Sequence, residues 1–141
     1  MPKKTRSLID EFLSRQRLLV LAPHSDDETI GAGGLIARVK AAGGSAFVMV
    51  FNVGDLHHFN DSADPVKGDT RVDELRQAMK VLRVDDFEVL FHDPGLVMRM
   101  DSLPRIELVS RIERSARLST QKVKPTMIVL PHSRSAPTAS T

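Results

Sequence analysis

The sequence predicts an α/β fold in which a Rossmann-like parallel sheet is flanked by helices. Four short apolar runs, bounded by polar residues or proline, alternate along the chain with segments whose apolar residues recur at helical spacing. The run over 18–22 is continuously apolar, which is typical of a parallel strand buried on both faces. Right-handed crossovers then place helices on both sides of one sheet. The 141 residues, 41% apolar and 27% charged, suit a single globular domain.

The first half of the chain predicts a helix, a strand, a second helix and a second strand. Ser7 is a suitable N-cap for the first helix, with Asp10 and Glu11 in the first turn, where carboxylates are favoured. The second helix ends at Gly43-Gly44, because glycine readily adopts the left-handed conformation that closes a helix. The three elements after the first helix cover 18–22, 29–42 and 46–51. The apolar face expected of the second helix comprises Ile30, Leu35, Ile36 and Val39.

The second half continues the alternation after a polar loop over 52–68, a length that is often functional. Thr70 and Asp73 resemble a capping box at the start of a helix over 69–83, and Ser102 is expected to cap a later helix. The apolar faces expected of these helices are Val72, Leu75, Met79 and Leu82 in the former, and Ile106, Val109, Ile112 and Ala116 in the latter. Strands are predicted at 87–91 and 127–130. We assign 1–131 to one domain and 132–141 to an irregular tail.

Composition excludes several kinds of site. The chain has no cysteine, so it forms no disulfide, and any metal must be held by histidine and carboxylate. No apolar run approaches the roughly 18 residues that a membrane span needs. The start is basic and is followed by a charged segment rather than by the apolar core of a signal peptide. We therefore expect a cytoplasmic protein without a transmembrane segment. We also expect no nucleic-acid partner. The sequence does not indicate the oligomeric state.

All five histidines follow the carboxyl end of a predicted strand. The first strand leads into Pro23-His24-Ser25-Asp26-Asp27-Glu28, and the second into a segment with His57 and His58. The third strand ends at His92-Asp93 and the fourth at His132. Ligands of open α/β sheets bind outside this edge of the sheet, so the sequence predicts a functional site there.

The turn after the first strand has the chemistry of a metal site. His24 and Asp27 supply an imidazole and a carboxylate within one turn, a combination that suits zinc. A catalytic zinc keeps one position open and lowers the pKa of its bound water to about 7, and Asp26 is then the candidate general base. Taken alone, Asp27 or Glu28 could equally be a helix cap. A histidine and three carboxylates packed into five residues instead favour a bound cation.

The turn and three later segments together resemble the LmbE-like, or PIG-L, de-N-acetylases. The segment 23–28 resembles the Pro-His-x-Asp-Asp-Glu signature of the family, and 29–34 resembles its glycine-rich helix start. Arg71-Val-Asp-Glu74 is similar to an Arg-x-x-Glu on the next helix, and 91–96 to a later loop. The first match is specific, and the others gain weight from their order along the chain.

The resemblance implies both an activity and roles for individual residues. Members of the family hydrolyse the N-acetyl group of N-acetylglucosamine-type sugars and their conjugates, with Zn²⁺ as cofactor. The resemblance implies that His24 and Asp27 bind zinc and that Asp26 is the general base. It also implies that Arg71 and Asp93 contact the acetylated sugar. Glu28 is expected to support the site from the start of the following helix, where a carboxylate is favoured.

The chain departs from the family pattern at the third metal ligand. The family takes this ligand from a His-x-x-His type segment after a later strand, whereas here Leu130-Pro131-His132 leads into a short low-complexity end. Either His132 serves as third ligand, or the site has two protein ligands and is weak or inactive. The histidines of the 52–68 loop are a further source. We expect the sheet to lack its last strands, and a frameshift or early stop would explain this.

Three alternatives stay open. A dinucleotide-binding domain would use Gly31 and Gly33, but Ile36 stands at its third glycine and the acidic turn would repel a pyrophosphate. A magnesium-binding, receiver-like phosphoacceptor domain would use Asp26, Asp27 and Asp93, although magnesium prefers oxygen ligands to a central histidine. The third alternative is an inactive, truncated remnant or a binding module of the deacetylase fold.

Overall fold

Four parallel strands form the sheet, and their spatial order is β3-β2-β1-β4. The computed structural model describes residues 7–55, 66–96, 99 and 102–131. The strands are β1 (Arg17–His24), β2 (Ser45–Asn52), β3 (Asp86–Phe91) and β4 (Met127–Val129). All three neighbouring pairs are parallel, so the predicted fold class is confirmed.

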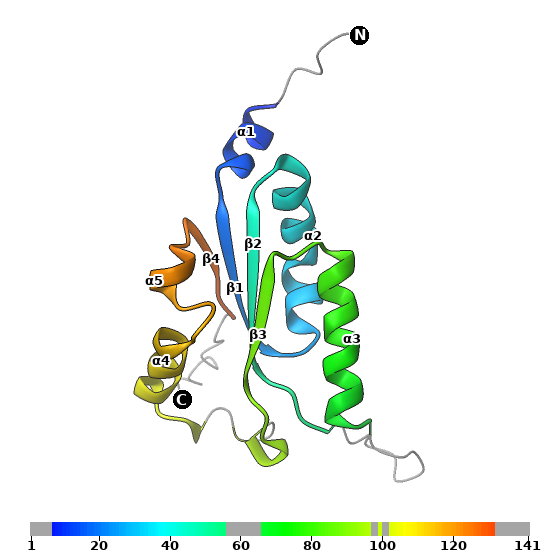
Figure 1. Ribbon diagram of the computed structural model, residues 1–141, viewed down its shortest axis with the longest axis vertical. Helices are drawn as coiled ribbons and strands as arrows, with labels where there is room; N and C mark the ends of the chain where they lie inside the picture. The colour runs from blue at the N-terminus through cyan, green and yellow to red at the C-terminus, as the bar shows by residue number, and fades with distance from the viewer. Residues whose placement is uncertain (1–6, 56–65, 97–98, 100–101, 132–141) are drawn as a thin grey trace, which may run out of the picture.

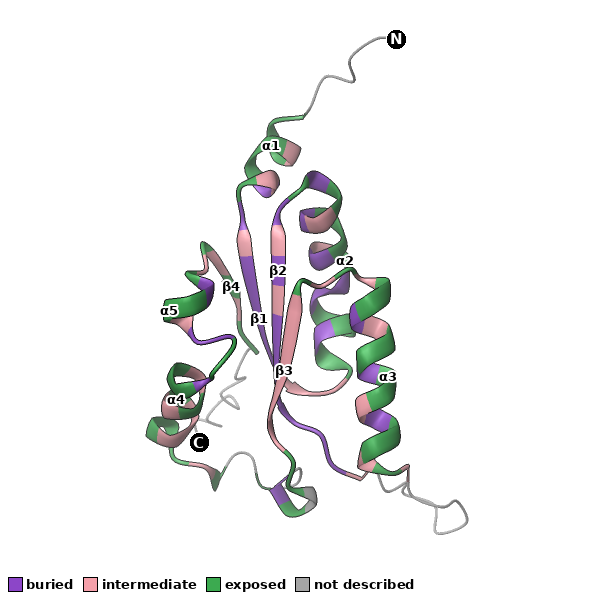
Figure 2. Ribbon diagram, in the orientation of Figure 1, coloured by how far each residue is buried: buried purple, intermediate pink, exposed green. Residues whose placement is uncertain are grey.

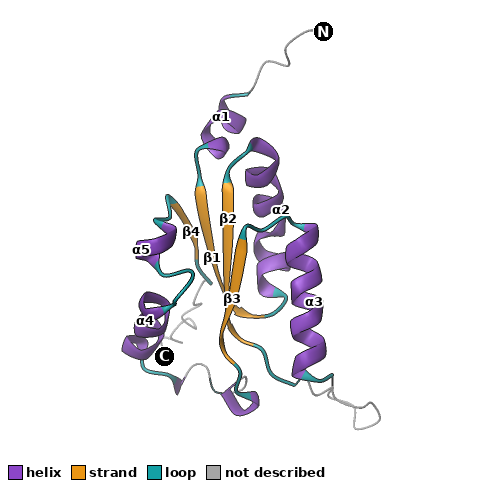
Figure 3. Cartoon of the chain, in the orientation of Figure 1, coloured by secondary structure: helices purple, strands orange, loops and turns teal. Residues whose placement is uncertain are grey.

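Helices cover both faces of the sheet (Figures 1 and 3). On one face lie α2 (Asp27–Ala42) and α3 (Gly68–Val81), and on the other lie α4 (Arg105–Arg114) and the short α5 (Thr120–Val123). The first helix, α1 (Leu8–Ser14), projects beyond the amino end of β1, and a 3₁₀ turn, η1 (Pro94–Leu96), follows β3. Within the described residues, no helix is long and apolar enough to cross a membrane.

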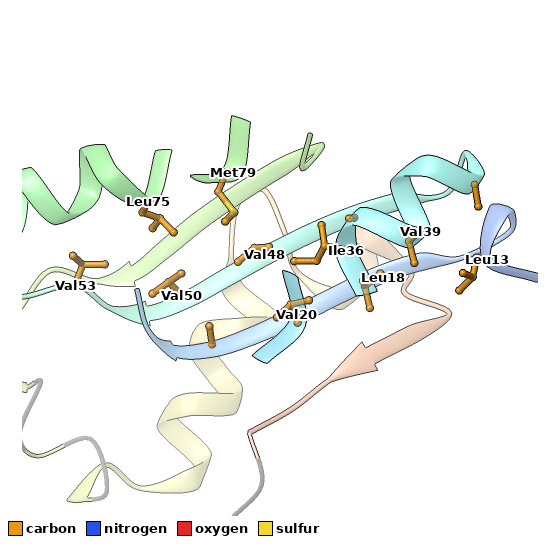
Figure 4. Packing of buried hydrophobic residues seen from close by; sticks show 14 residues of the cluster. Leu13, Leu18, Val20, Ile36, Val39, Val48, Val50, Val53, Leu75 and Met79 are labelled. Carbon is orange, nitrogen blue, oxygen red and sulfur yellow. The ribbon is translucent and has the colours of Figure 1, made fainter. Parts of the chain in front are cut away.

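The larger core lies between the sheet and the helices α2 and α3. Alternate residues of β1 and β2 point to this side, so Leu18, Val20, Val48 and Val50 pack against Ile36 and its neighbours (Figure 4). The opposite face of the same strands contributes Leu19, Leu21, Met49 and Phe51, and it is covered by Leu118 and Val123. Both faces of the central strands β1 and β2 are therefore buried, as their apolar runs predict.

The helix predictions are confirmed at α1 and corrected at α2 and α3. The Ser7 hydroxyl accepts the Asp10 N–H at 3.1 Å, as expected of an N-cap. Ile30 is 83% exposed, because it precedes Ile36 by six residues and so lies about 120° away from it around the helix. The capping box at Thr70 is also wrong: α3 begins at Gly68, whose N–H is accepted by Asp55 Oδ1 at 2.7 Å.

The predictions for α4 fail more broadly. Its N-cap is Pro104 rather than Ser102, whose hydroxyl instead donates to the Arg99 carbonyl. No residue of α4 is buried (Figure 2), and Ile106 and Val109 are exposed. Ile112, in the last turn, packs against the smaller core. Ala116 is exposed as well, and it lies after the end of the helix.

Candidate metal and active site

The carboxyl ends of β1, β2 and β3 meet at one edge of the sheet, the lower edge in Figure 1. His24 of β1 is in register with Asn52 of β2, and Asn52 is in register with Phe91 of β3. The turn after His24, the loop after Asn52 and the segment His92-Asp93 therefore start level with one another. This edge is where the sequence predicts the site.

The turn between β1 and α2 brings the two predicted metal ligands together. His24 Nδ1 lies 3.5 Å from Asp27 Oδ2, and both side chains are partly accessible to solvent. The backbone N–H of His24 also donates to Asp27 Oδ2 at 3.1 Å, which fixes the carboxylate against the end of the strand. A tetrahedral zinc bound to a nitrogen and an oxygen at ordinary bond lengths holds these atoms about 3.4 Å apart. The pair as it stands therefore fits a zinc ion.

Asp26 has an unusual backbone conformation and a free side chain. Its φ of 147° and ψ of −32° lie in a region that residues other than glycine rarely adopt. It occupies the N-cap position of α2, where its carbonyl accepts the N–H groups of Thr29 and Ile30. Its exposed carboxylate makes no capping hydrogen bond. Helix capping, the alternative weighed for Asp27 and Glu28, does not explain the Asp26 side chain.

Glu28 is a buried carboxylate in the same turn, with 1% of its surface exposed. Its Oε2 accepts the backbone N–H of Asp26 at 3.0 Å, and its Oε1 accepts the hydroxyl of Thr29 at 3.0 Å. The first bond reaches back to the N-cap residue, as the glutamate of a capping box does. Through this hydrogen bond, Glu28 stabilises the strained backbone of Asp26.

The charge of this turn has little compensation within the described part of the chain. No lysine or arginine there forms an ion pair with Asp26, Asp27 or Glu28. The positive end of the α2 dipole offsets part of this charge. Three adjacent carboxylates, one of them buried, are the environment in which a bound cation is most stabilising.

Arg71 ties the turn to the loop after β2. Its side chain is on α3 and the residue is 8% exposed. Nη1 donates to the Gly54 carbonyl at 2.9 Å, and Nη2 donates to the Ser25 carbonyl at 3.4 Å. The guanidinium lines a groove of about 240 Å³ that also contains Asp26 and Glu74. The predicted contact with substrate is not tested by these bonds and stays a prediction.

Asp93 sits at the start of η1, and its backbone is held by Asn52. The Asn52 amide donates from Nδ2 to the Asp93 carbonyl at 2.8 Å and accepts the Asp93 N–H at Oδ1 at 3.3 Å. Asp93 Oδ1 in turn accepts the N–H of Gly95 at 2.8 Å. Sequence reasoning assigns no role to Asn52; its one signal is an amide directly after the apolar run 46–51.

The candidates for a third metal ligand lie outside what the structure describes. No group of three or more His, Asp or Glu side chains suited to a metal occurs among residues 7–55, 66–96, 99 and 102–131. His132, His57 and His58 fall in the remaining segments, as does the predicted tail 132–141, so these predictions are untested. A largely apolar groove of about 360 Å³ runs from Asp27 to Leu130 and Pro131, the last described residues before His132.

Comparison with known proteins identifies the family. The model of the family described as PIG-L, GlcNAc-PI de-N-acetylase, matches residues 19–139. The chain belongs to the PIG-L family. This match begins in β1 and includes the whole turn 23–28, and it confirms the resemblance that the turn indicates.

Two curated deacetylases and one solved structure are similar to this chain. A 1D-myo-inositol 2-acetamido-2-deoxy-alpha-D-glucopyranoside deacetylase of Streptomyces avermitilis is 33% identical over 98 residues, which are 60% of this chain and 33% of the relative. The same-named enzyme of Thermomonospora curvata is 27% identical over 131 residues, 81% of this chain and 44% of its own. The crystal structure of the conserved protein TT1542 from Thermus thermophilus has a TM-score of 0.57 and 25% identity, and the match covers 83% of this chain and 46% of that one. The chain thus spans less than half the length of these three proteins.

Proposed function

We propose that this chain carries the metal-binding turn and the general base of a zinc-dependent N-deacetylase. The substrate class is an N-acetylglucosamine-type sugar or its conjugate. The observation that carries the proposal is the turn itself, where His24 and Asp27 present a metal-sized pair of ligands beside the free carboxylate of Asp26. Membership of the PIG-L family supports the reaction type.

The donor set supports zinc over magnesium. An imidazole nitrogen and one carboxylate oxygen are typical zinc ligands, whereas magnesium binds oxygen and keeps several waters. When bound, zinc would polarise the amide carbonyl and acidify the attacking water. His24 and Asp27 would hold the ion, and the third ligand would come from a segment such as the one that contains His132.

The residues of the turn have distinct tasks in the proposed reaction. Asp26 accepts a proton from water as the water oxygen attacks the acetyl carbon. Asp26 then returns the proton to the amide nitrogen as the carbon–nitrogen bond breaks, and acetate and the free amine are released. Glu28 keeps Asp26 in its strained conformation through the Asp26 N–H. Because Asp26 makes no capping bond, its carboxylate is free to take up this proton.

The relatives support the proposed substrate class. The two named above are deacetylases of an inositol-linked 2-acetamido-2-deoxyglucopyranoside. We propose that Arg71 and Asp93 contact such a sugar, since both lie at the loops that follow the carboxyl ends of the strands. Arg71 also lines the groove beside Asp26, where hydroxyl or phosphate oxygens of a conjugate would find a donor.

A second candidate is a binding module, or an inactive member, of the same fold. It is favoured by one observation: the described residues hold two ligands of the proposed metal and no third. A site with two protein ligands would bind zinc weakly and would not orient water.

Metal content separates these candidates. The chain is stripped with a chelator, reloaded with zinc and dialysed. Zinc is then measured beside a His24→Ala variant and a control far from the site edge, Asp10→Asn on α1. One zinc per chain, lost only at His24→Ala, together with release of acetate from N-acetylglucosaminyl-inositol, supports the enzyme. A folded chain that retains no zinc favours the inactive member, and zinc retained without acetate release favours the binding module.

A further inference from the structure

Asn52 is the one fully buried amide at the site edge of the described chain. It is the last residue of β2, and its exposure is 0%. It lies in the same row of the sheet as His24 on one side and Phe91 on the other. A buried amide destabilises a fold unless its hydrogen bonds are made, so an amide at this position requires an explanation.

Both polar ends of the amide bind the backbone of a single residue. Nδ2 donates to the Asp93 carbonyl at 2.8 Å, and Oδ1 accepts the Asp93 N–H at 3.3 Å. The last ladder pairing of β2 with β3 is at Phe91, and the next backbone bond, Val53 N–H to the Phe91 carbonyl, is long at 3.4 Å. The Asn52 side chain thus links the end of β2 to the segment after β3, beyond the last backbone pair of the two strands.

The remaining bonds of Asp93 restrict its carboxylate as well. Oδ1 accepts the Gly95 N–H at 2.8 Å, and the Asp93 carbonyl also accepts the Leu96 N–H at 3.1 Å. Oδ2 makes no hydrogen bond or ion pair with another described residue, although Asp93 is exposed at the site edge. The backbone is therefore held by Asn52 and one carboxylate oxygen by the turn, which leaves the other oxygen free for a ligand.

We propose that Asn52 is a positioning residue that fixes Asp93 relative to the His24 turn and thereby sets how tightly the acetylated sugar binds. The inference rests on the proposed function, in which Asp93 contacts substrate. Asn52 acts through Asp93 and does not touch the sugar itself. An apolar side chain of similar size would fill the same space but would leave the Asp93 N–H without its partner.

A double-mutant cycle tests the coupling. Asn52→Ala removes both hydrogen bonds, and Asp93→Ala removes the proposed contact while leaving the backbone atoms that Asn52 binds. In the full chain loaded with zinc, Asn52→Ala is expected to raise KM about tenfold with a smaller effect on kcat, and about twofold or less when Asp93 is already alanine. Val48→Ala is the matched control, because Val48 is equally buried on the same strand and face.

Amide hydrogen exchange tests the clamp without any need for activity. Asn52→Ala is expected to speed exchange of the Asp93 N–H at least tenfold, while Val48→Ala leaves that amide as slow as in the parent chain. Asn52→Ser is carried in parallel and takes the place of the alanine variant if the latter does not fold.

Three results would overturn the inference: unchanged Asp93 exchange, an equal KM rise in Val48→Ala, or a full Asn52→Ala effect in the Asp93→Ala background. A parent chain that binds zinc but releases no acetate would refute the proposed enzyme. In that case the exchange measurement alone decides whether Asn52 positions Asp93.

Discussion

Asp26 combines an uncommon backbone conformation with a side chain that the fold does not use. Backbone strain of this kind costs about 1 to 3 kcal/mol and persists only where surrounding contacts impose it. Here the N–H of Asp26 is held by the buried Glu28, and its carbonyl accepts the first N–H groups of α2. A capping role would have been satisfied by a relaxed aspartate. The strain therefore supports a functional rather than a structural role for the Asp26 carboxylate.

Asp26→Asn tests that role, since the amide keeps the shape of the side chain but cannot accept the proton. We expect kcat to fall by about 10²- to 10⁴-fold, the usual contribution of a general base. Zinc content should stay at the parent level, because the ligands His24 and Asp27 are untouched. Acetate release and metal content are measured together, with Asp10→Asn, on α1, as the control. A variant that keeps parental turnover would remove Asp26 as the base.

Arg71 offers a second residue-scale test, of stability. Lysine cannot reproduce the fork that spans the Gly54 and Ser25 carbonyls, so Arg71→Lys should leave one of them unpaired. We expect a loss of about 1 to 3 kcal/mol in the free energy of unfolding, measured by urea denaturation. The exposed Arg76→Lys on the same helix should change it by about 0.5 kcal/mol or less. Equal losses in the two variants would show that the carbonyl bonds of Arg71 contribute nothing.

The site residues differ in how well the sequence predicts that they lie together. His24, Asp26 and Asp27 could be predicted, because one turn contains all three and local spacing is enough to bring them together. The binding partners of Arg71 and Asn52 could not, because they depend on how β2, β3 and α3 are placed in space. The metal roles of the predicted residues stay predictions.

At the scale of elements, strands and buried helices were predictable and the partly covered helix was not. Apolar runs locate all four strands, and those of β1 and β2 are the longest because both faces of these central strands are buried. For α3 the face with Leu75 and Met79 is confirmed. For α4 the spacing of apolar residues indicated a buried face, but only Ile112 packs against the core. Helical periodicity cannot show how much of a helix reaches the sheet.

Alanine substitutions at two glycines, one in α2 and one just after it, are expected to change the free energy of unfolding in opposite directions. A Cβ on Gly44 would lie 2.5 Å from the Leu13 carbonyl oxygen and 2.7 Å from Val39, so Gly44→Ala should lower the free energy of unfolding by about 1 to 3 kcal/mol. A Cβ on Gly34 meets nothing within 4 Å, and alanine is the better helix former there. Gly34→Ala should therefore raise that free energy by about 0.5 to 1 kcal/mol. Thermal unfolding of both variants measures the pair; two changes of the same sign would contradict the packing described for α2.

At the scale of the whole molecule, metal binding should be visible as stability. A ligand that binds only the folded state at 100 times its Kd adds about 2.7 kcal/mol. We expect Zn²⁺ to raise the Tm of the parent chain, a chelator to reverse the change, and His24→Ala to abolish it. Mg²⁺ at the same concentration serves as the comparison. An equal rise with Mg²⁺ would contradict the preference for zinc.

The pairing of β1 with β4 has a consequence for how the chain is made. Arg17 at the start of β1 donates its backbone N–H to the Thr126 hydroxyl, 109 residues later. Ribosomes add about 5 to 20 residues each second, so one side of β1 waits about 5 to 20 s for its neighbour. The other edge of β1 pairs much sooner with β2, because only α2 separates these two strands in the sequence. Throughout that interval the nascent chain exposes an apolar strand edge, and chaperone binding to the first half of the protein should be strongest then.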